Sequence, residues 1–124
     1  MITLLVCLAG PAVSMPICPE HGKRISCVVD GDTIWFEREK IRLLSIDAPE
    51  LFSPKCSQEA LQAREARDRL ADLLNGEMRV EREGEDRYGR TLARVFVDGR
   101  DVGELLVREG LVRRWVGRRE PWCG

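Results

Sequence analysis

The chain has 124 residues, which is enough for one domain with a single hydrophobic core and too few for two. Its residues are 44% hydrophobic and 33% charged, a balance typical of a globular protein, and no low-complexity run or repeat is visible. The net charge of −1 excludes a uniformly cationic protein, and no interior stretch approaches the roughly 20 apolar residues of a membrane span.

The first 14 residues carry no charged side chain, are mostly apolar and end in Ala12-Val13-Ser14, a pattern suited to signal peptidase. They are short for a signal peptide and lack Lys or Arg near the start, so a buried first strand or a misplaced start codon is the alternative. We favour export. We expect a signal-peptide-like segment at 1–14, a lead-in at 15–24, one domain at 25–116 and a tail at 117–124.

Cysteine usage supports export. Removal of the first segment would leave Cys18, Cys27, Cys56 and Cys123, an even number in a short chain. No pair has Cys-x-x-Cys spacing and there is one histidine, so disulfides fit better than a structural zinc site. Four cysteines allow three pairings, which the sequence leaves open. Because disulfides form in oxidising compartments, we predict a secreted or periplasmic protein.

Strand and helix patterns follow one another along the chain. Alternating hydrophobic residues and runs of β-branched and aromatic residues predict strands, whereas apolar residues at helical spacing between 57 and 75 predict an amphipathic helix with Ser57 as its N-cap. A second helix has Asp101 as its candidate cap. We expect strands at 25–29, 33–36, 41–46, 78–83 and 90–97, a hairpin tip at 37–40, helices at 57–75 and 102–109, and irregular structure at 111–124.

Five short strands, with a helix after the third and another after the fifth, suit an α+β protein that is mainly β. The order favours a five-stranded Greek-key barrel of the OB type, since closure removes the exposed edges of an open sheet.

Two acidic turns bracket the second and third strands. Asp30-Gly31-Asp32 precedes the hairpin and Asp47-Ala48-Pro49-Glu50 follows it, so folding brings both turns to the same end. Gathered carboxylates repel unless a cation lies between them, and oxygen ligands without His or Cys select calcium or magnesium. Ordinary surface turns are the alternative, because Asp-Gly is a common turn pair.

Arginines follow the same part of the fold. The predicted third strand would point Arg42 toward the acidic site, where a guanidinium can bind phosphate; pairing with Glu37 or Glu39 is the alternative. The turn Arg87-Tyr88-Gly89-Arg90 adds two cations. Residues 108–119 hold five arginines and one acid, which indicates either a face that attracts phosphate or a solvated helix and tail. Trp115 is expected to pack the tail, with base stacking as the alternative.

Four segments, in order, make the chain resemble the thermonuclease (staphylococcal nuclease-like) family. They are Val28-Val29-Asp30-Gly31-Asp32-Thr33-Ile34, Ile41-Arg42-Leu43-Leu44-Ser45-Ile46-Asp47-Ala48-Pro49-Glu50, Asp86-Arg87-Tyr88-Gly89-Arg90-Thr91-Leu92-Ala93, and Val102-Gly103-Glu104-Leu105-Leu106-Val107-Arg108-Glu109-Gly110-Leu111.

The resemblance implies an OB-fold, calcium-dependent endonuclease that hydrolyses DNA and RNA to 3′-phosphate products. It further implies these roles: calcium ligation by Asp32, Asp47 and the Ala48 carbonyl, activation or positioning of water by Glu50, transition-state contacts by Arg42 and Arg90, and terminal-phosphate contacts by Arg87 and Tyr88. We expect a monomer without stable membrane association.

The main competing function is an OB-type module that binds nucleic acid or protein without cutting. Such a module should lack some of the acidic or arginine positions, and here all of them are present. A disulfide-stapled structural domain would explain the cysteines and leave the acidic turns and arginines without a role.

Overall fold

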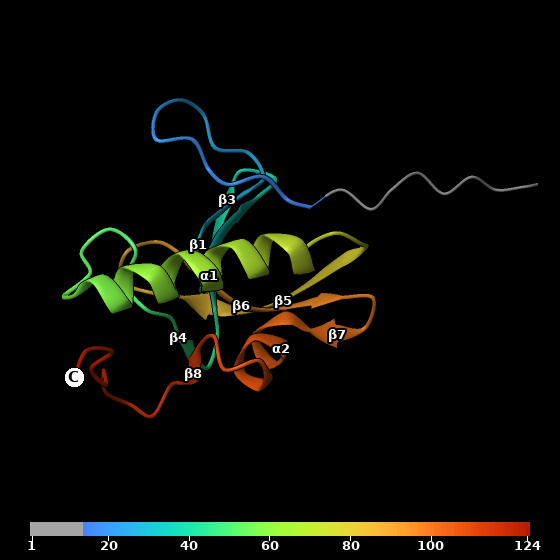
Figure 1. Ribbon diagram of the computed structural model, residues 1–124. Coiled ribbons are helices and arrows are strands. Elements are labelled where there is room, and N and C mark those ends of the chain that lie inside the picture. Colours follow the sequence, from blue (N-terminus) through green and yellow to red (C-terminus); the bar gives the residue numbers. More distant parts are fainter. Residues whose placement is uncertain (1–13) are drawn as a thin grey trace, which may run out of the picture.

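The computed structural model describes residues 14–124, so the signal-peptide-like segment expected at 1–14 lies outside the described residues apart from Ser14. Helix α1 lies across a curled sheet, and α2 packs on the far side beside the C-terminal segment (Figure 1). The elements in order are β1 (Cys27–Asp30), β2 (Thr33–Phe36), β3 (Glu39–Leu43), β4 (Ile46–Asp47), α1 (Ser57–Leu73), β5 (Met78–Glu85), β6 (Thr91–Val97), β7 (Arg100–Asp101), α2 (Val102–Arg108) and β8 (Arg113–Arg114).

The main sheet has the strand order β1-β2-β3-β6-β5, with β7 paired to β6. Neighbours are antiparallel except β3 and β6, which run parallel with Ile41 opposite Thr91. This order, with α1 between the third and fourth long strands, is that of the OB fold and confirms the predicted α+β class. Within residues 14–124 no ladder joins β1 to β5, in keeping with a partly open Greek-key barrel.

The first hairpin is tighter than the sequence predicted. Phe36 pairs with Glu39, so the turn consists of Glu37 and Arg38 alone, both with positive φ (48° and 70°). A two-residue loop of this conformation matches the twist of the flanking strands. Strand β3 therefore begins at Glu39, and the expected four-residue tip at 37–40 is wrong. A two-residue turn of this type usually contains Asn or Gly, and here both turn residues are charged, so it could not be recognised from the sequence.

The expected strand at 41–46 is divided. A positive φ of 68° at Ser45 ends β3, and the chain resumes as β4, which pairs antiparallel with β8. The tail was expected to be irregular from 111 onward, and β8 corrects that expectation. Two-residue strands carry no periodic signal, so neither could be recognised without its partner.

Both helices agree with the sequence pattern. Helix α2 has the expected N-cap, since the Asp101 carboxylate accepts hydrogen bonds from the amides of Gly103 and Glu104. Helix α1 begins at Ser57, but its N-cap is Cys56, whose sulfur accepts from the Glu59 amide at 3.4 Å. The backbone of Cys56 is extended, as is typical of an N-cap, so Cys56 and not Ser57 is the cap.

The core lies between the sheet and the two helices. Ile34 and Ile41 from the sheet, Leu70 from α1 and Leu106 from α2 are fully buried. Burial of apolar side chains of this size contributes about 1.5–3 kcal/mol each. The core thus holds β3 and α1 in fixed relation, and the turns at their ends are placed accordingly.

The structure pairs Cys18 with Cys27 and Cys56 with Cys123, which resolves the three pairings left open by the sequence. The first disulfide holds the lead-in beside β1, where Ile17 bridges Val28. The second spans a sequence separation of 67, and the loop-entropy model assigns about 4 kcal/mol to a loop of that length. It ties the last residues to the first turn of α1.

Gly31 allows the first acidic turn to rest on α1. A Cβ at this position would lie 2.8 Å from the Cβ of Ala66 and 3.0 Å from that of Ala48. We therefore expect Gly31→Ala to lower the free energy of unfolding by about 1–3 kcal/mol through overpacking, measured by urea denaturation. Ala66→Gly in the same chain should recover part of the loss. Equal destabilisation with and without Ala66→Gly would contradict the expected contact.

Glu39 joins three strands. Its carboxylate accepts hydrogen bonds from Arg82 in β5 and from Thr91 in β6 at 2.7 Å, and these bonds lower the pKa of Glu39 from 4.5 to about 2. The stabilisation is present above the ordinary pKa and is lost as the pH falls from about 4.5 to about 2. We expect the stability difference between wild type and Glu39→Gln to shrink over this range, measured by denaturant titration. A pH-independent difference, or an equal trend for the exposed Glu65→Gln, would contradict this assignment.

Candidate active site

Asp32 joins the two acidic turns. Its carboxylate accepts hydrogen bonds from the Ala48 amide at 3.1 Å and from the Thr33 hydroxyl at 3.0 Å. Its own amide donates to the Asp30 carboxylate at 3.1 Å. The hairpin therefore brings the turns together at one end of the sheet, as the sequence predicted.

A single cavity of about 440 Å³ opens beside these turns. It is bounded by the turn after β1, by β3, by the segment after β4, by the turn between β5 and β6, and by the C-terminal segment. It includes every residue that the sequence analysis assigned to a metal, phosphate or catalytic role. Its lining residues are Asp30, Asp32, Arg42, Asp47, Ala48, Pro49, Glu50, Arg87, Tyr88, Arg90, Trp115 and Arg119.

Arg42 is held beside the acidic turns. Its guanidinium donates to the carbonyls of Leu43 at 2.6 Å and Ile46 at 2.9 Å, and lies 3.4 Å from the Asp32 carboxylate. Glu39, one of the two alternative partners, pairs with Arg82 instead. Main-chain carbonyls thus hold the Arg42 guanidinium beside the cavity, and no bound ligand is needed to orient it.

The turn between β5 and β6 supplies the second group of cations. The Asp86 carboxylate accepts from the amides of Tyr88 and Arg90, both at 2.9 Å, and from the Arg90 side chain at 2.6 Å. The exposed ring of Tyr88 lies 5.0 Å from the guanidinium of Arg87 and 5.6 Å from that of Arg90. Asp86 therefore fixes the turn whose two arginines, Arg87 and Arg90, line the cavity.

The carboxylates at the acidic end of the cavity are crowded and largely buried. Asp32 and Asp47 are 9% and 6% exposed. Burial, with the charge of Asp32 added, raises the pKa of Asp30 from 3.8 to about 8. Burial also raises the pKa of Asp47, although the charges of Arg119 and Arg42 oppose the shift. Such carboxylates favour an added cation, whether a proton or a metal ion.

Four lining residues, Asp30, Pro49, Trp115 and Arg119, were not assigned to the site from the sequence. Asp30 belongs to the recognised acidic turn, but nothing in the pattern separated its role from that of Asp32. Trp115 follows β8 and is 48% exposed. Arg119 forms an ion pair with Glu50. The basic stretch 108–119 contained the signal for Arg119, without indicating which of its arginines reaches the cavity.

Within residues 14–124, no group of three or more His, Cys, Asp or Glu side chains is arranged to hold a metal ion. A metal here would therefore need main-chain or water oxygens beside the carboxylates. In the same residues no helix is both long and apolar enough to cross a membrane.

Known proteins resemble this chain over most of its length. It is 39% identical over 94 residues to Endonuclease YncB of Bacillus subtilis (strain 168), covering 68% of this chain and 44% of that protein. It is 35% identical over 92 residues to a Thermonuclease of Staphylococcus intermedius, covering 69% and 55%. It is 34% identical over 120 residues to a Micrococcal nuclease of Shigella flexneri, covering 86% and 64%.

The chain thus spans about half the length of these relatives. A family model, described as Staphylococcal nuclease homologue, matches residues 40–121. That range contains all of β3 but its first residue, the second acidic turn, both helices and the arginine turn, which together build most of the cavity. The chain belongs to the family of staphylococcal nuclease homologues.

Proposed function

We propose that this chain is a calcium-dependent nuclease that hydrolyses phosphodiester bonds of DNA and RNA and leaves 3′-phosphate products. The observation that carries the proposal is the single cavity lined by Asp32, Asp47 and Glu50 together with Arg42 and Arg90. Oxygen donors and guanidinium groups in one cavity suit a divalent cation and a phosphate together. The names of the relatives, which describe nucleases, support the same activity.

The donors in the cavity fit a calcium ion. Asp32 and Asp47 are buried carboxylates, and the Ala48 carbonyl would complete the protein's share of the ligands. Crowded, buried carboxylates favour a hard cation, and the lining residues that the structure describes include no His or Cys, the donors typical of zinc. When bound, calcium would supply charge to a phosphate oxygen and orient a water molecule.

Arg42 and Arg90 would bind the scissile phosphate. Hydrolysis adds negative charge to a five-coordinate phosphorus, so fixed cations stabilise the transition state more than the bound substrate. Arg42 is held by two carbonyls and Arg90 by Asp86, so little reorganisation is required when charge develops. Arg87 and Tyr88, at the rim of the cavity, would hold a neighbouring terminal phosphate.

Glu50 would position the attacking water or accept its proton. A correctly placed general base usually contributes a factor of about 10²–10⁴. Its main chain is fixed, since the Glu50 amide donates to the buried Glu59 carboxylate at 3.1 Å. The remaining rate enhancement would come from the two arginines and the cation.

The two disulfides support a location in an oxidising compartment, so we propose that the protein is secreted or periplasmic. In that setting its partners would be DNA and RNA substrates, with no stable membrane association, and the chain would act as a monomer.

Arg42→Gln and Glu50→Gln should each lower kcat by about 10²–10³, the usual effect of removing one fixed transition-state group, while the thermal midpoint stays near that of wild type. Arg42→Lys should recover part of the activity, because charge remains without the paired donors. The assay is cleavage of a fluorogenic DNA oligonucleotide with calcium. Arg64→Gln, on the exposed face of α1, is the matched control. Full activity in Glu50→Gln would contradict the proposed role.

Calcium should be required. We expect EDTA to abolish plasmid and RNA degradation and added calcium to restore it, because the carboxylates would otherwise repel the phosphate. Calorimetry should detect calcium binding to wild type and to Glu65→Gln, and lose it in Asp32→Asn. Nucleic-acid binding without cleavage under every metal condition would favour the non-catalytic module instead.

A further inference from the structure

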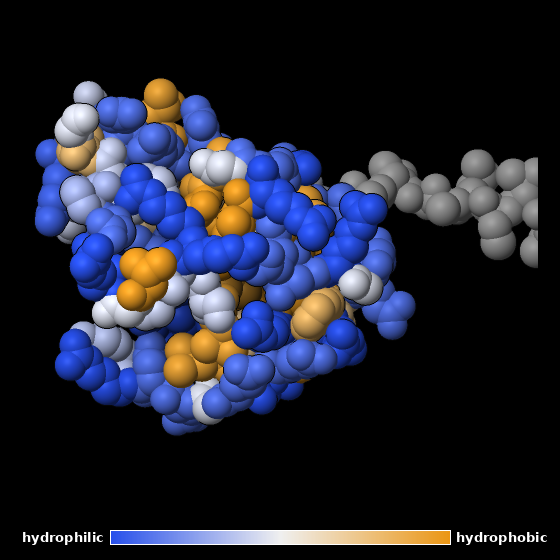
Figure 2. All heavy atoms as spheres, turned by 90° about the horizontal axis from the view of Figure 1, so that it is seen from below, coloured by the Kyte–Doolittle hydropathy of each residue, from blue (hydrophilic) through white to orange (hydrophobic). Residues whose placement is uncertain are grey.

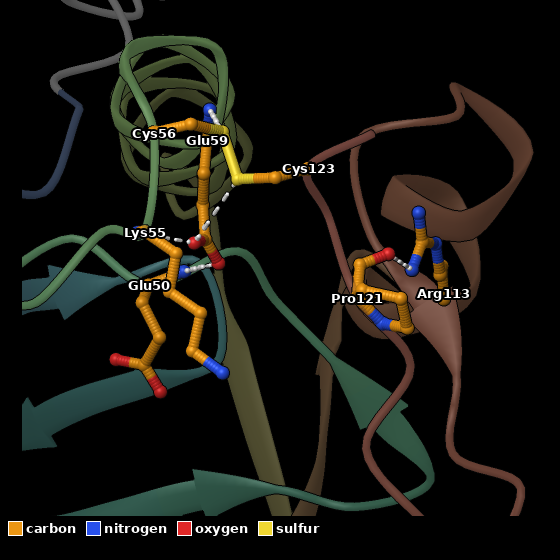
Figure 3. The surroundings of a disulfide bond; sticks show 7 residues. All are labelled: Glu50, Lys55, Cys56, Glu59, Arg113, Pro121 and Cys123. Atoms are coloured by element: carbon orange, nitrogen blue, oxygen red, sulfur yellow. Dashed lines mark hydrogen bonds between the residues drawn. A yellow bond between two sulfur atoms is a disulfide. The ribbon is translucent and has the colours of Figure 1, made fainter.

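The C-terminal strap, residues 115–123, is anchored at both ends. At its start, the Trp115 amide donates to the Ser45 carbonyl at 2.9 Å and extends the pairing of β8 with β4. At its end, Cys123 is bonded to Cys56 at the N-terminus of α1 (Figure 3). Figure 1 shows the same segment leaving β8 and running through a loop to the C-terminus. The strap is therefore attached to two parts of the fold that also position the cavity.

Arg113 adds a third anchor. Its guanidinium donates to the Pro121 carbonyl at 2.9 Å and lies 3.7 Å from the ring centroid of Trp122. Figure 3 shows the Arg113 side chain directed at the Pro121 carbonyl. A cation over an indole ring stabilises by about 0.5–2 kcal/mol. These contacts limit the positions that the residues between β8 and Cys123 can take.

Arg119 lies between these anchors and binds Glu50. It lines the candidate active-site cavity and also an adjoining cavity of about 510 Å³. Its guanidinium forms an ion pair with the Glu50 carboxylate, and its charge acts on Asp47 as well. The strap thus places a cation against the proposed catalytic carboxylate.

The main chain and the side chain of Glu50 are held by different groups. The Glu59 carboxylate, in α1, accepts from the Glu50 amide and from the Lys55 amide at 2.8 Å, which fixes the main chain. Among the described residues, Arg119 is the side chain bound to the Glu50 carboxylate. Without Arg119 the carboxylate would be free to sample several rotamers.

The neighbouring arginine behaves differently. The Arg118 side chain is 79% exposed and pairs with Glu120. It is absent from the lining of both cavities. The contact with Glu50 therefore belongs to one position in the strap rather than to the basic character of the tail.

We propose that Arg119 is a positioning residue for Glu50, and that the Cys56–Cys123 disulfide keeps it in place, so that full activity requires the oxidised protein. The proposal rests on the proposed nuclease function. A dithiol reductant would break the S–S bond, supply two electrons and two protons, and leave two thiols. The end of the strap would then be released from α1, and Arg119 would no longer be confined to Glu50.

Arg119→Gln should lower kcat by about tenfold or more, because a small misplacement of a reacting group can reduce the rate by about 10². KM should change by less than about twofold, since the group acts through Glu50 rather than on the phosphate. Arg119→Lys should be intermediate, and Arg118→Gln should match wild type. In a Glu50→Gln background, Arg119→Gln should cause no further loss, which is the signature of a residue that acts through Glu50.

Each alternative result has a definite meaning. An unchanged kcat in Arg119→Gln would overturn the inference, and so would an increase, which would make the strap inhibitory. A raised KM with unchanged kcat would assign Arg119 to phosphate binding and would also overturn it. A wild-type protein that does not cut would contradict the proposed function itself.

The redox step is tested with Cys56→Ser/Cys123→Ser, assayed well below its melting transition. Its kcat should fall to that of Arg119→Gln, with no further fall when the variants are combined. Cys18→Ser/Cys27→Ser, which removes the other disulfide, is the matched control and should keep wild-type kcat. Trypsin should cleave after Arg118 or Arg119 faster when Cys56 and Cys123 are replaced, as measured by mass spectrometry. Wild-type kcat together with unchanged trypsin resistance would overturn the proposal.

Discussion

The hydrogen bond from the Ala48 amide to the Asp32 carboxylate is the contact on which the cavity depends. It joins the turn that precedes the β2–β3 hairpin to the turn that follows it, and it sets Asp47 and Glu50 beside Asp32. The carbonyls of Leu43, at the end of β3, and of Ile46, in β4, accept hydrogen bonds from the Arg42 guanidinium and orient it. The close packing of Gly31 on Ala66 holds this arrangement against α1.

The ion pairs on the surface and the charged side chains in the cavity have different roles. Several ion pairs are exposed and contribute little to stability, as for Arg118 with Glu120 and Arg79 with Glu81. In the cavity, by contrast, carboxylates are buried beside one another, and the pKa of Asp30 rises to about 8. A fold gains nothing in stability from such crowding, so the arrangement is explained by the cation and phosphate that the proposed reaction needs. Hydrophilic residues cover most of the face shown in Figure 2, and hydrophobic residues are visible in smaller patches between them.

Helix α1 connects the core to the site. Leu70 and Ala66 pack in the core, while Glu59 in its first turn holds the main chain of Glu50. Cys56, immediately before the helix, is bonded to Cys123 and so brings the strap to the same place. One rigid element thus supports the proposed catalytic carboxylate and the segment that carries Arg119, which explains why the C-terminus is tied down rather than loose.

The sequence by itself determined the OB order of strands and helices, because hydrophobic periodicity and cap residues act locally. It also indicated that Asp32 and Asp47 would meet, since a hairpin returns the chain to its starting end. Tertiary structure alone decided the pairing of β4 with β8, the partners of the four cysteines, and the contact of Arg119 with Glu50. Each of these joins segments far apart in the chain, and the relevant residues show the same local pattern whether or not a partner lies opposite. A short strand, a cysteine or an arginine in a basic tail acquires its role only from the surface that folding brings against it.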